Sequence, residues 1–175
     1  MLIKVIVLFL FLQLGNGYDR PQVVDEYDLK AAYLYNFTNY ITWNDMDTSK
    51  KFIIGVIGDS PIIEPLLDIV NERSYYNKEI VIKKYNKYNE IGYCHILFIP
   101  ESEKEKQEYI LQGIQNKNML TIAETRGAAT NGVCINFFLK DNKLRFEINL
   151  EAVYKSKLKI SSQLLKLGVL VDNSY

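Results

Sequence analysis

The sequence predicts a three-layer α/β domain: a mostly parallel, Rossmann-like sheet with helices on both faces and an antiparallel hairpin at its C-terminal edge. Strand-like and helix-like segments alternate through the middle of the chain, which is the order typical of parallel sheets with crossover helices. The run FIIGVI at 52–57 is apolar throughout, as strands buried on both faces are. Near the C-terminus, two strand-like segments flank the polar stretch KDNK at 140–143, which indicates the hairpin.

The first 17 residues have the layout of a secretory signal peptide. Lys4 supplies a positive charge, residues 5–14 form an apolar run, and Gly15–Asn16–Gly17 closes it with small residues. That run is too short to hold the mature chain in a bilayer, so we expect cleavage after Gly17 and an exported protein that does not span a membrane. A buried first strand or helix is the alternative. The remaining residues, 18–175, suit a single domain.

An N-terminal helix is expected over Asp25–Thr42, with Asp25 as its N-cap. Apolar residues recur on two sides of this helix. One face holds Leu29, Ala32, Tyr33, Phe37 and Tyr40, and the other holds Tyr27, Leu34, Tyr35 and Ile41. Such a helix is either deeply buried or shared between the core and a second subunit. We favour the shared arrangement, which predicts a homodimer.

The central elements follow in alternation. The predicted strands are 52–57, 79–84, 94–99 and 119–123, and the predicted helices are 62–71 and 103–115. Pro61 suits the start of the first of these helices, because that position needs no amide hydrogen. A loop with two glycines at 127–132 then leads into the hairpin strands, 133–139 and 144–149.

The stretch from Leu144 to Leu167 carries polar side chains on one face of its strand. Apolar and polar residues alternate, so Arg145, Glu147 and Asn149 share the face opposite the apolar side chains. This polar face is either a solvated edge or a recognition surface. A helix is expected from Glu151, for which Asn149 is a suitable cap, and a short amphipathic run starts at Ser161.

The balance of charges and the two cysteines limit the classes of function that fit this chain. Basic and acidic residues balance at 21 each, which leaves no positive field to attract nucleic acid. Cys94 and Cys134 lie in two apolar, strand-like runs and would meet an oxidising compartment after export. They form a disulfide if those strands are neighbours with suitable geometry; otherwise they are small buried hydrophobes.

Two fragments suggest catalysis or metal binding, and neither is complete. Gly58–Asp59–Ser60 resembles the nucleophile block of exported SGNH-type hydrolases, which also need an Asp-x-x-His block. The one histidine, His95, lies in an apolar strand instead, so a turn before a helix is the favoured interpretation and an active-serine probe should not label Ser60. One histidine and two separated cysteines also lack the spacing of a metal site. We therefore expect a binding function, with no catalytic residue, metal or cofactor.

Five blocks in register resemble the YfiR family of periplasmic regulators, the YfiR/HmsC-like proteins. The blocks are Leu29–Trp43, Phe52–Pro61, Tyr93–Ser102, Leu120–Phe137 and Leu144–Val171. The resemblance implies a periplasmic, non-enzymatic α/β protein, commonly a homodimer. It implies binding to the periplasmic sensor part of an inner-membrane diguanylate cyclase of the YfiN type, which represses the cyclase and so controls cyclic di-GMP signalling and biofilm formation. A histidine kinase or a transport system is the alternative partner.

The resemblance also implies roles for individual residues. Arg145 and Glu147 become candidates for the partner-binding face, with an internal ion pair between them as the alternative. A small aromatic ligand is implied near the end of the first helix, at Ile41, Trp43, Phe52, Lys159 and Ser161, although Trp43 also suits plain core packing. Small-ligand binding in the periplasm is therefore the alternative function. Redox-controlled family members need four cysteines, and this chain has two, so Cys94–Cys134 is the one bridge that can form.

Overall fold

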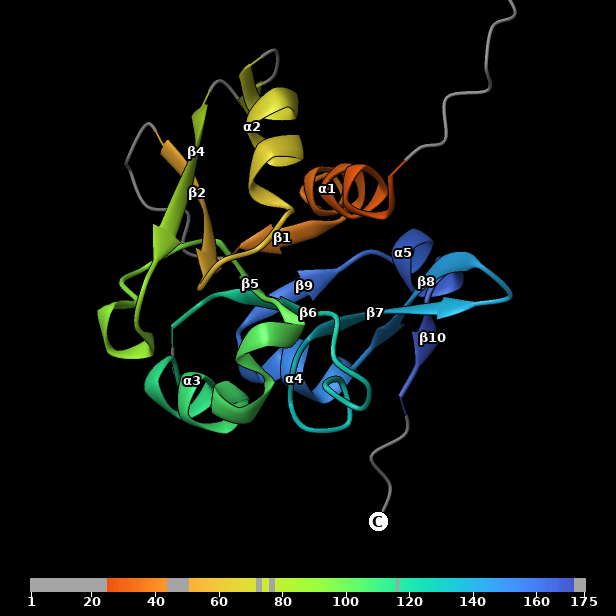
Figure 1. Cartoon of the computed structure of the whole chain (residues 1–175). Coiled ribbons are helices and arrows are strands. Elements are labelled where there is room, and N and C mark those ends of the chain that lie inside the picture. Colours follow the sequence, from red (N-terminus) through yellow and green to blue (C-terminus); the bar gives the residue numbers. More distant parts are fainter. Residues whose placement is uncertain (1–24, 44–50, 72–73, 76–77, 116, 172–175) are drawn as a thin grey trace, which may run out of the picture.

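The computed structural model describes residues 25–43, 51–71, 74–75, 78–115 and 117–171. The predicted signal peptide lies outside the described residues. Within them, one large sheet separates two layers of helices, with α1 (Glu26–Phe37) and α2 (Ile63–Asn71) on one face and α3 (Gln107–Gly113) and α4 (Leu150–Lys155) on the other (Figure 1). The predicted three-layer α/β fold is therefore confirmed. None of the described helices is both long and apolar enough to cross a membrane.

The large sheet has the strand order β10-β8-β7-β6-β5-β2-β4-β3. Its strands are β2 (Lys51–Ile57), β3 (Ser74–Tyr75), β4 (Lys78–Tyr85), β5 (Ile96–Ile99), β6 (Leu120–Ala123), β7 (Ile135–Lys140), β8 (Lys143–Ile148) and β10 (Val169–Leu170). The pairs from β4 across to β7 are parallel, and β8 turns back antiparallel to β7. Asp141 and Asn142 make the hairpin turn with φ of 51° and 55°, a left-handed conformation that these two residue types tolerate. The hairpin is not the last element of the sheet, because β10 pairs in parallel with β8 beyond it.

The N-terminal helix is shorter than predicted. Asp25 caps it as expected, but α1 ends at Phe37, and the segment predicted as its last turn is strand β1 (Ile41–Trp43). The Thr38 hydroxyl donates to the Tyr35 carbonyl at 2.6 Å, and the β-branched and aromatic residues that follow pair antiparallel with β9 (Leu158–Ile160). A strand partner from far along the chain thus replaces the helical continuation.

The buried stripe of α1 also differs from the predicted faces. It consists of Lys30, Ala31, Leu34 and Phe37, whereas Leu29 is 41% exposed. Leu34 and Ile41, assigned above to a second face shared with another subunit, both belong to the core of this chain. The homodimer thus loses the observation that suggested it and stays a prediction.

Helices α2, α4 and α5 (Ser162–Leu167) start within a residue or two of the expected places, whereas α3 starts at Gln107 and not at residue 103. A 3-10 segment at Glu101–Lys106 precedes α3, and another lies at Tyr88–Glu90. Asn149 caps α4, as predicted, by accepting a hydrogen bond from the Ala152 amide at 2.9 Å. It is not part of an outward polar face, however, because it is buried and also donates to the Ala129 carbonyl at 2.7 Å. Ser161 caps α5 in the same way as Asn149 caps α4.

The core forms two clusters, and each holds one cysteine. Cys94 packs with Tyr85 and Leu97 in the smaller cluster, which also contains residues from α3, whereas Cys134 belongs to the larger cluster with residues of α1. Both thiols are free and buried. Cys94 Sγ lies 3.9 Å from Met119 Sδ, and Cys134 Sγ lies 3.7 Å from Ser156 Oγ. The structure therefore has the two separate buried thiols, and not the Cys94–Cys134 bridge.

These buried groups predict a loss of stability in alkali. Burial raises the pKa of the Cys94 thiol from 9.0 to about 12, and desolvation raises the pKa of the Tyr85 phenol to about 12. A group with a raised folded-state pKa stabilises the fold fully below its unfolded pKa and loses that contribution as the pH rises through its folded pKa. The free energy of unfolding should therefore fall between pH 9.0 and about 12.

Urea unfolding at several pH values across that interval measures the slope. The Cys94→Ala variant should be less stable at neutral pH, because it leaves a small cavity, but should show a shallower alkaline decline than the wild-type protein. Equal slopes for the two proteins would contradict the assignment of this decline to Cys94.

Candidate functional site

One face of the sheet at its β10 end carries polar and apolar side chains together. Asn136 pairs in register with Glu147, Phe138 with Arg145, and Glu147 with Val169. Residues paired across strands project to the same side of a sheet, so these five side chains share one face, which we call the β7–β8–β10 face. The alternate residues Phe137 and Phe146 project to the opposite side and pack in the larger core cluster.

The β7–β8–β10 face is accessible at its outer part. Arg145 is exposed, Glu147 and Phe138 are half-buried, and Val169 is 53% exposed. Among the ion pairs of the described residues, Glu147 does not pair with Arg145; it accepts a hydrogen bond from Asn136 Nδ2 at 3.1 Å. The alternative of an internal ion pair between Arg145 and Glu147 is thus not formed among the described residues. The β7–β8–β10 face combines charged, polar and apolar side chains.

A crevice opens where β6 ends. The residues after β6 form one wall, helix α1 forms the second, and strands β7 and β8 form the third. Its volume is about 460 Å³, and it is lined by Glu26, Lys30, Glu124, Arg126, Gly127, Asn136, Phe137, Phe138, Leu139, Leu144 and Glu147. Clefts beyond the carboxyl ends of parallel strands are common ligand sites in α/β folds. Glu147 therefore lies both on the β7–β8–β10 face and in this crevice.

A buried ion pair forms the inner wall of the crevice. Lys30 Nζ lies 2.5 Å from Glu124 Oε2 and 2.5 Å from Glu26 Oε1, and the side chains of Lys30 and Glu124 are only 5% and 6% exposed. Glu124 also accepts from the Tyr27 hydroxyl and the Glu101 amide. Burial alone would lower the pKa of Lys30, but its hydrogen bonds to both carboxylates outweigh that effect and the pKa is raised. Lys30 is therefore charged at neutral pH.

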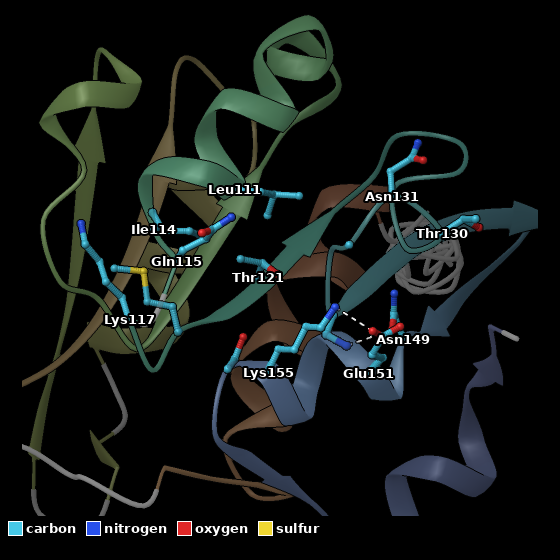
Figure 2. A pocket seen from close by; sticks show the side chains of 14 residues that line it. Leu111, Ile114, Gln115, Lys117, Thr121, Thr130, Asn131, Asn149, Glu151 and Lys155 are labelled. Carbon is cyan, nitrogen blue, oxygen red and sulfur yellow. Dashed lines mark hydrogen bonds and ion pairs between the residues drawn. The ribbon is translucent and has the colours of Figure 1, made fainter. Parts of the chain in front are cut away.

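A second, larger pocket lies between α3 and α4 on the opposite side of β6 (Figure 2). Its volume is about 670 Å³, and Figure 2 shows Leu111 and Ile114 facing Lys155 and Glu151 across it. Polar groups that line it are used within the fold. Thr121 Oγ1 accepts from the Cys134 amide, Asn149 caps α4, and Lys155 pairs with Glu151. Both cavities hold polar groups that are bonded within the fold, but only the crevice includes Glu147 and a buried acceptor without a partner among the described residues, Asn136 Oδ1, so the crevice is the stronger candidate site.

Comparison with known families identifies the kind of protein. The profile of the YfiR/HmsC-like family matches residues 27–169, which include every strand of both sheets except the last residue of β10. The chain belongs to the YfiR/HmsC-like family.

The comparison with solved structures supports the fold of the chain and nothing beyond the fold. No curated protein matches the chain. A solved structure of a conserved domain protein from Vibrio cholerae O1 biovar eltor str. N16961 is similar, with a TM-score of 0.58 and 9% sequence identity. The match covers 84% of this chain and 60% of that protein, so the chain spans less than two thirds of the length of this neighbour.

In this YfiR/HmsC-like protein, the predicted ligand residues lie on or near the β1–β9 pair, but the side chain of Lys159 projects to the side opposite to the buried Ile41 and Trp43. The β1–β9 pairing sets Ile41 opposite Ile160 and Thr42 opposite Lys159, and the Ser161 amide donates to the Tyr40 carbonyl at 2.9 Å. Lys159 is exposed, whereas Trp43 and Phe52 are 2% and 0% exposed. The five residues line neither the crevice nor the larger pocket. Aromatic ligand binding there stays a prediction.

Trp43 has the contacts of a core residue. Its ring meets Phe52 edge-on with 5.1 Å between centroids, and its Nε1 donates to the His95 carbonyl at 3.0 Å. His95 itself is fully buried, stacks on Phe52 at 4.4 Å, and accepts a hydrogen bond from the Ile53 amide through Nδ1. The interpretation of His95 as a core histidine is thus confirmed.

The Gly58–Asp59–Ser60 fragment lies far from that histidine. Ser60 follows the carboxyl end of β2, while His95 precedes the amino end of β5, which runs parallel to β2. The two side chains are therefore at opposite ends of the sheet, and Asp59 forms an ion pair with Lys84. The fragment is the predicted turn before α2. Among the described residues there is also no cluster of His, Cys, Asp and Glu that suits a metal ion.

The sequence analysis named Glu147 as a candidate but did not name Lys30 and Asn136, which line the same crevice. Lys30 falls in the same helical stripe as Leu34 and Phe37, and a lysine in an apolar stripe is a signal that a buried carboxylate lies nearby. Asn136 interrupts an otherwise apolar strand in a comparable way. Both positions could have been noted, but only the fold shows that they meet.

Proposed function

We propose that this protein binds the periplasmic sensor part of an inner-membrane diguanylate cyclase and represses it, using the β7–β8–β10 face. The observation that carries this proposal is that exposed Arg145 and half-buried Glu147 share one face with the apolar side chains of Phe138 and Val169. Apolar area supplies affinity in a protein interface, while charges of both signs set the register of the partner. Family membership supports a membrane sensor as that partner.

Residues at the edge of the sheet extend this surface. Leu167, Val169 and Leu170 are 62%, 53% and 50% exposed, and β10 leaves its outer side without a neighbouring strand in the described sheet. An apolar edge strand of this kind favours contact with another chain. A homodimer is part of the proposal, and this edge now supports it better than α1 does.

Reversing one charge on the face should weaken partner binding. The Glu147→Lys variant places a second cation beside Arg145. The partner surface that would contact the Glu147 carboxylate then meets a positive charge instead. Affinity for the sensor domain should therefore fall at least about tenfold, or about 1.4 kcal/mol. Titration of the purified protein with the isolated periplasmic domain of the cyclase measures it. Glu90→Lys, a reversal at an exposed residue of the Tyr88–Glu90 segment, is the matched control and should bind normally.

Two outcomes would count against this use of Glu147. Unchanged affinity with an intact thermal transition would remove the β7–β8–β10 face from the interface. Loss of the thermal transition would instead assign Glu147 a structural function through Asn136. The same titration with the sensor domain of a neighbouring histidine kinase tests the alternative partner.

A further inference from the structure

The Asn136 side chain lacks one hydrogen-bond partner at the crevice. This residue is 1% exposed, and its Nδ2 donates to Glu147 Oε2 at 3.1 Å. Because an ionised carboxylate only accepts hydrogen bonds, this contact fixes the orientation of the amide and assigns Oδ1 to its other end. Within the described residues, Oδ1 is buried and has no hydrogen-bond partner. A buried acceptor without a donor costs about 1–3 kcal/mol, so this site needs a donor.

The charges of the crevice specify which kind of donor fits. Three carboxylates, Glu26, Glu124 and Glu147, line it together with two cations, Lys30 and Arg126. Lys30 is already bound to Glu26 and Glu124. Glu147 is the half-buried carboxylate nearest to Asn136, so a donor that reaches both groups meets a negative charge and a neutral acceptor. Charge-assisted bonds are roughly twice as strong as neutral ones, which favours a cationic donor.

The rest of the lining accommodates an apolar body. Phe138 is half-buried and lies on the same side of the sheet as Asn136 and Glu147, and Leu139 and Leu144 line the crevice from the opposite side. The volume of about 460 Å³ exceeds what an ammonium ion alone would fill. The site therefore suits a cationic head joined to a short apolar chain.

We infer that the crevice binds a small organic cation with N–H donors, of the alkylammonium or alkylguanidinium class. The head lies between Asn136 Oδ1 and Glu147, and the alkyl part lies against Phe138, which projects to the same side of the sheet as these two residues. This inference concerns the isolated protein and does not depend on the proposed membrane partner, so the two can fail separately.

A series of ligands with one carbon skeleton tests the inference. Pentylamine, 1-pentanol and pentanoate present a cation, a neutral donor and an anion on the same alkyl chain. Titration of the ¹⁵N-labelled protein, followed through the side-chain amide signals of Asn136, should give saturable shifts with pentylamine in the millimolar range, as expected for a ligand of about six heavy atoms. The alcohol should bind about tenfold more weakly, and the anion should cause no shift.

Two variants locate the binding. Glu147→Gln keeps the acceptor for Asn136 Nδ2 but removes the charge, so it should weaken pentylamine binding about tenfold. Glu90→Gln, outside the crevice, should bind pentylamine as the wild-type protein does. Equal binding of the three ligands to the wild-type protein, absence of any shift up to about 50 mM pentylamine, or full binding by Glu147→Gln would each overturn the inference. If Glu147→Gln does not fold, the ligand series on the wild-type protein decides.

Discussion

Replacement of Lys30 by methionine should destabilise the protein by about 3–5 kcal/mol, the range measured when one partner of a buried ion pair is removed. The reason is the position of Glu124, whose side chain is 6% exposed. Without Lys30, that carboxylate keeps the Tyr27 hydroxyl and the Glu101 amide as donors but has no cation beside it. Methionine fills a similar volume, so the decrease in the free energy of unfolding measures the effect of removing the charge and not the effect of a cavity.

Urea unfolding at neutral pH measures this effect, with two comparisons. The double variant Lys30→Met/Glu124→Leu removes both charges and should recover much of the lost stability, since apolar replacements of buried ion pairs are often tolerated. Lys155→Met breaks an ion pair whose side chains are 75% and 56% exposed, and should cost less than about 1 kcal/mol. A Lys30→Met variant no less stable than Lys155→Met would show that the pair contributes little.

Replacement of Trp43 by alanine should cost about 3–5 kcal/mol of stability, as truncation of a buried aromatic residue does. The indole is 2% exposed, packs edge-on against Phe52, and donates a hydrogen bond to the His95 carbonyl. Trp43→Phe keeps much of the ring contact and loses the hydrogen bond, so its cost should be intermediate. Thermal or urea unfolding of both variants measures the difference.

The Trp43 result also decides between the two functions considered for this residue. Tyr154→Ala, at an aromatic residue that is 63% exposed, is the control and should leave stability nearly unchanged. If Trp43→Ala behaved like this control and abolished stabilisation of the protein by an aromatic ligand, Trp43 would be a ligand-binding residue. A large loss of stability in the absence of ligand would place it in the core.

Much of the fold is predictable because its strands have strong local signals. The apolar run at 52–57 and the alternation at 144–149 each correspond to a strand of the structure, and Asn149 caps α4 where the helix was expected to start. These features depend on neighbours in sequence, such as side-chain periodicity and a cap three residues away.

The short strands escaped prediction for the opposite reason. β1, β9 and β10 have three, three and two residues, too few for a periodic pattern. They are strands only because they pair with residues far away in the sequence, as Ile41 does with Ile160. Tertiary pairing here overrides the local preference that extended α1 to Thr42.

The candidate site was also predicted only in part. As with the strands, the features set by neighbours in sequence were predictable, and those set by distant residues were not. Alternation along 144–149 placed Glu147 on a polar face with Arg145 and Asn149, and the family resemblance made Glu147 and Arg145 candidates for partner binding. The crevice required the positions of Lys30, Glu124 and Asn136, which come from a helix, a loop and a strand, and nothing in the sequence states that they meet. The different exposure of Arg145 and Glu147 was also not decidable from alternation, because β10 pairs with β8 at Glu147 and not at Arg145.

The pairing of β1 with β9 has a consequence for how the chain folds. This ladder joins the residues just after the first helix to residues near the end of the domain, so the N-terminal helix acquires its final contacts only when almost the whole polypeptide is present. Contacts of such long sequence separation raise the contact order and slow folding. An exported protein of the kind proposed above would gain from slow folding, because β1 has no partner strand in the described sheets until β9 has been made.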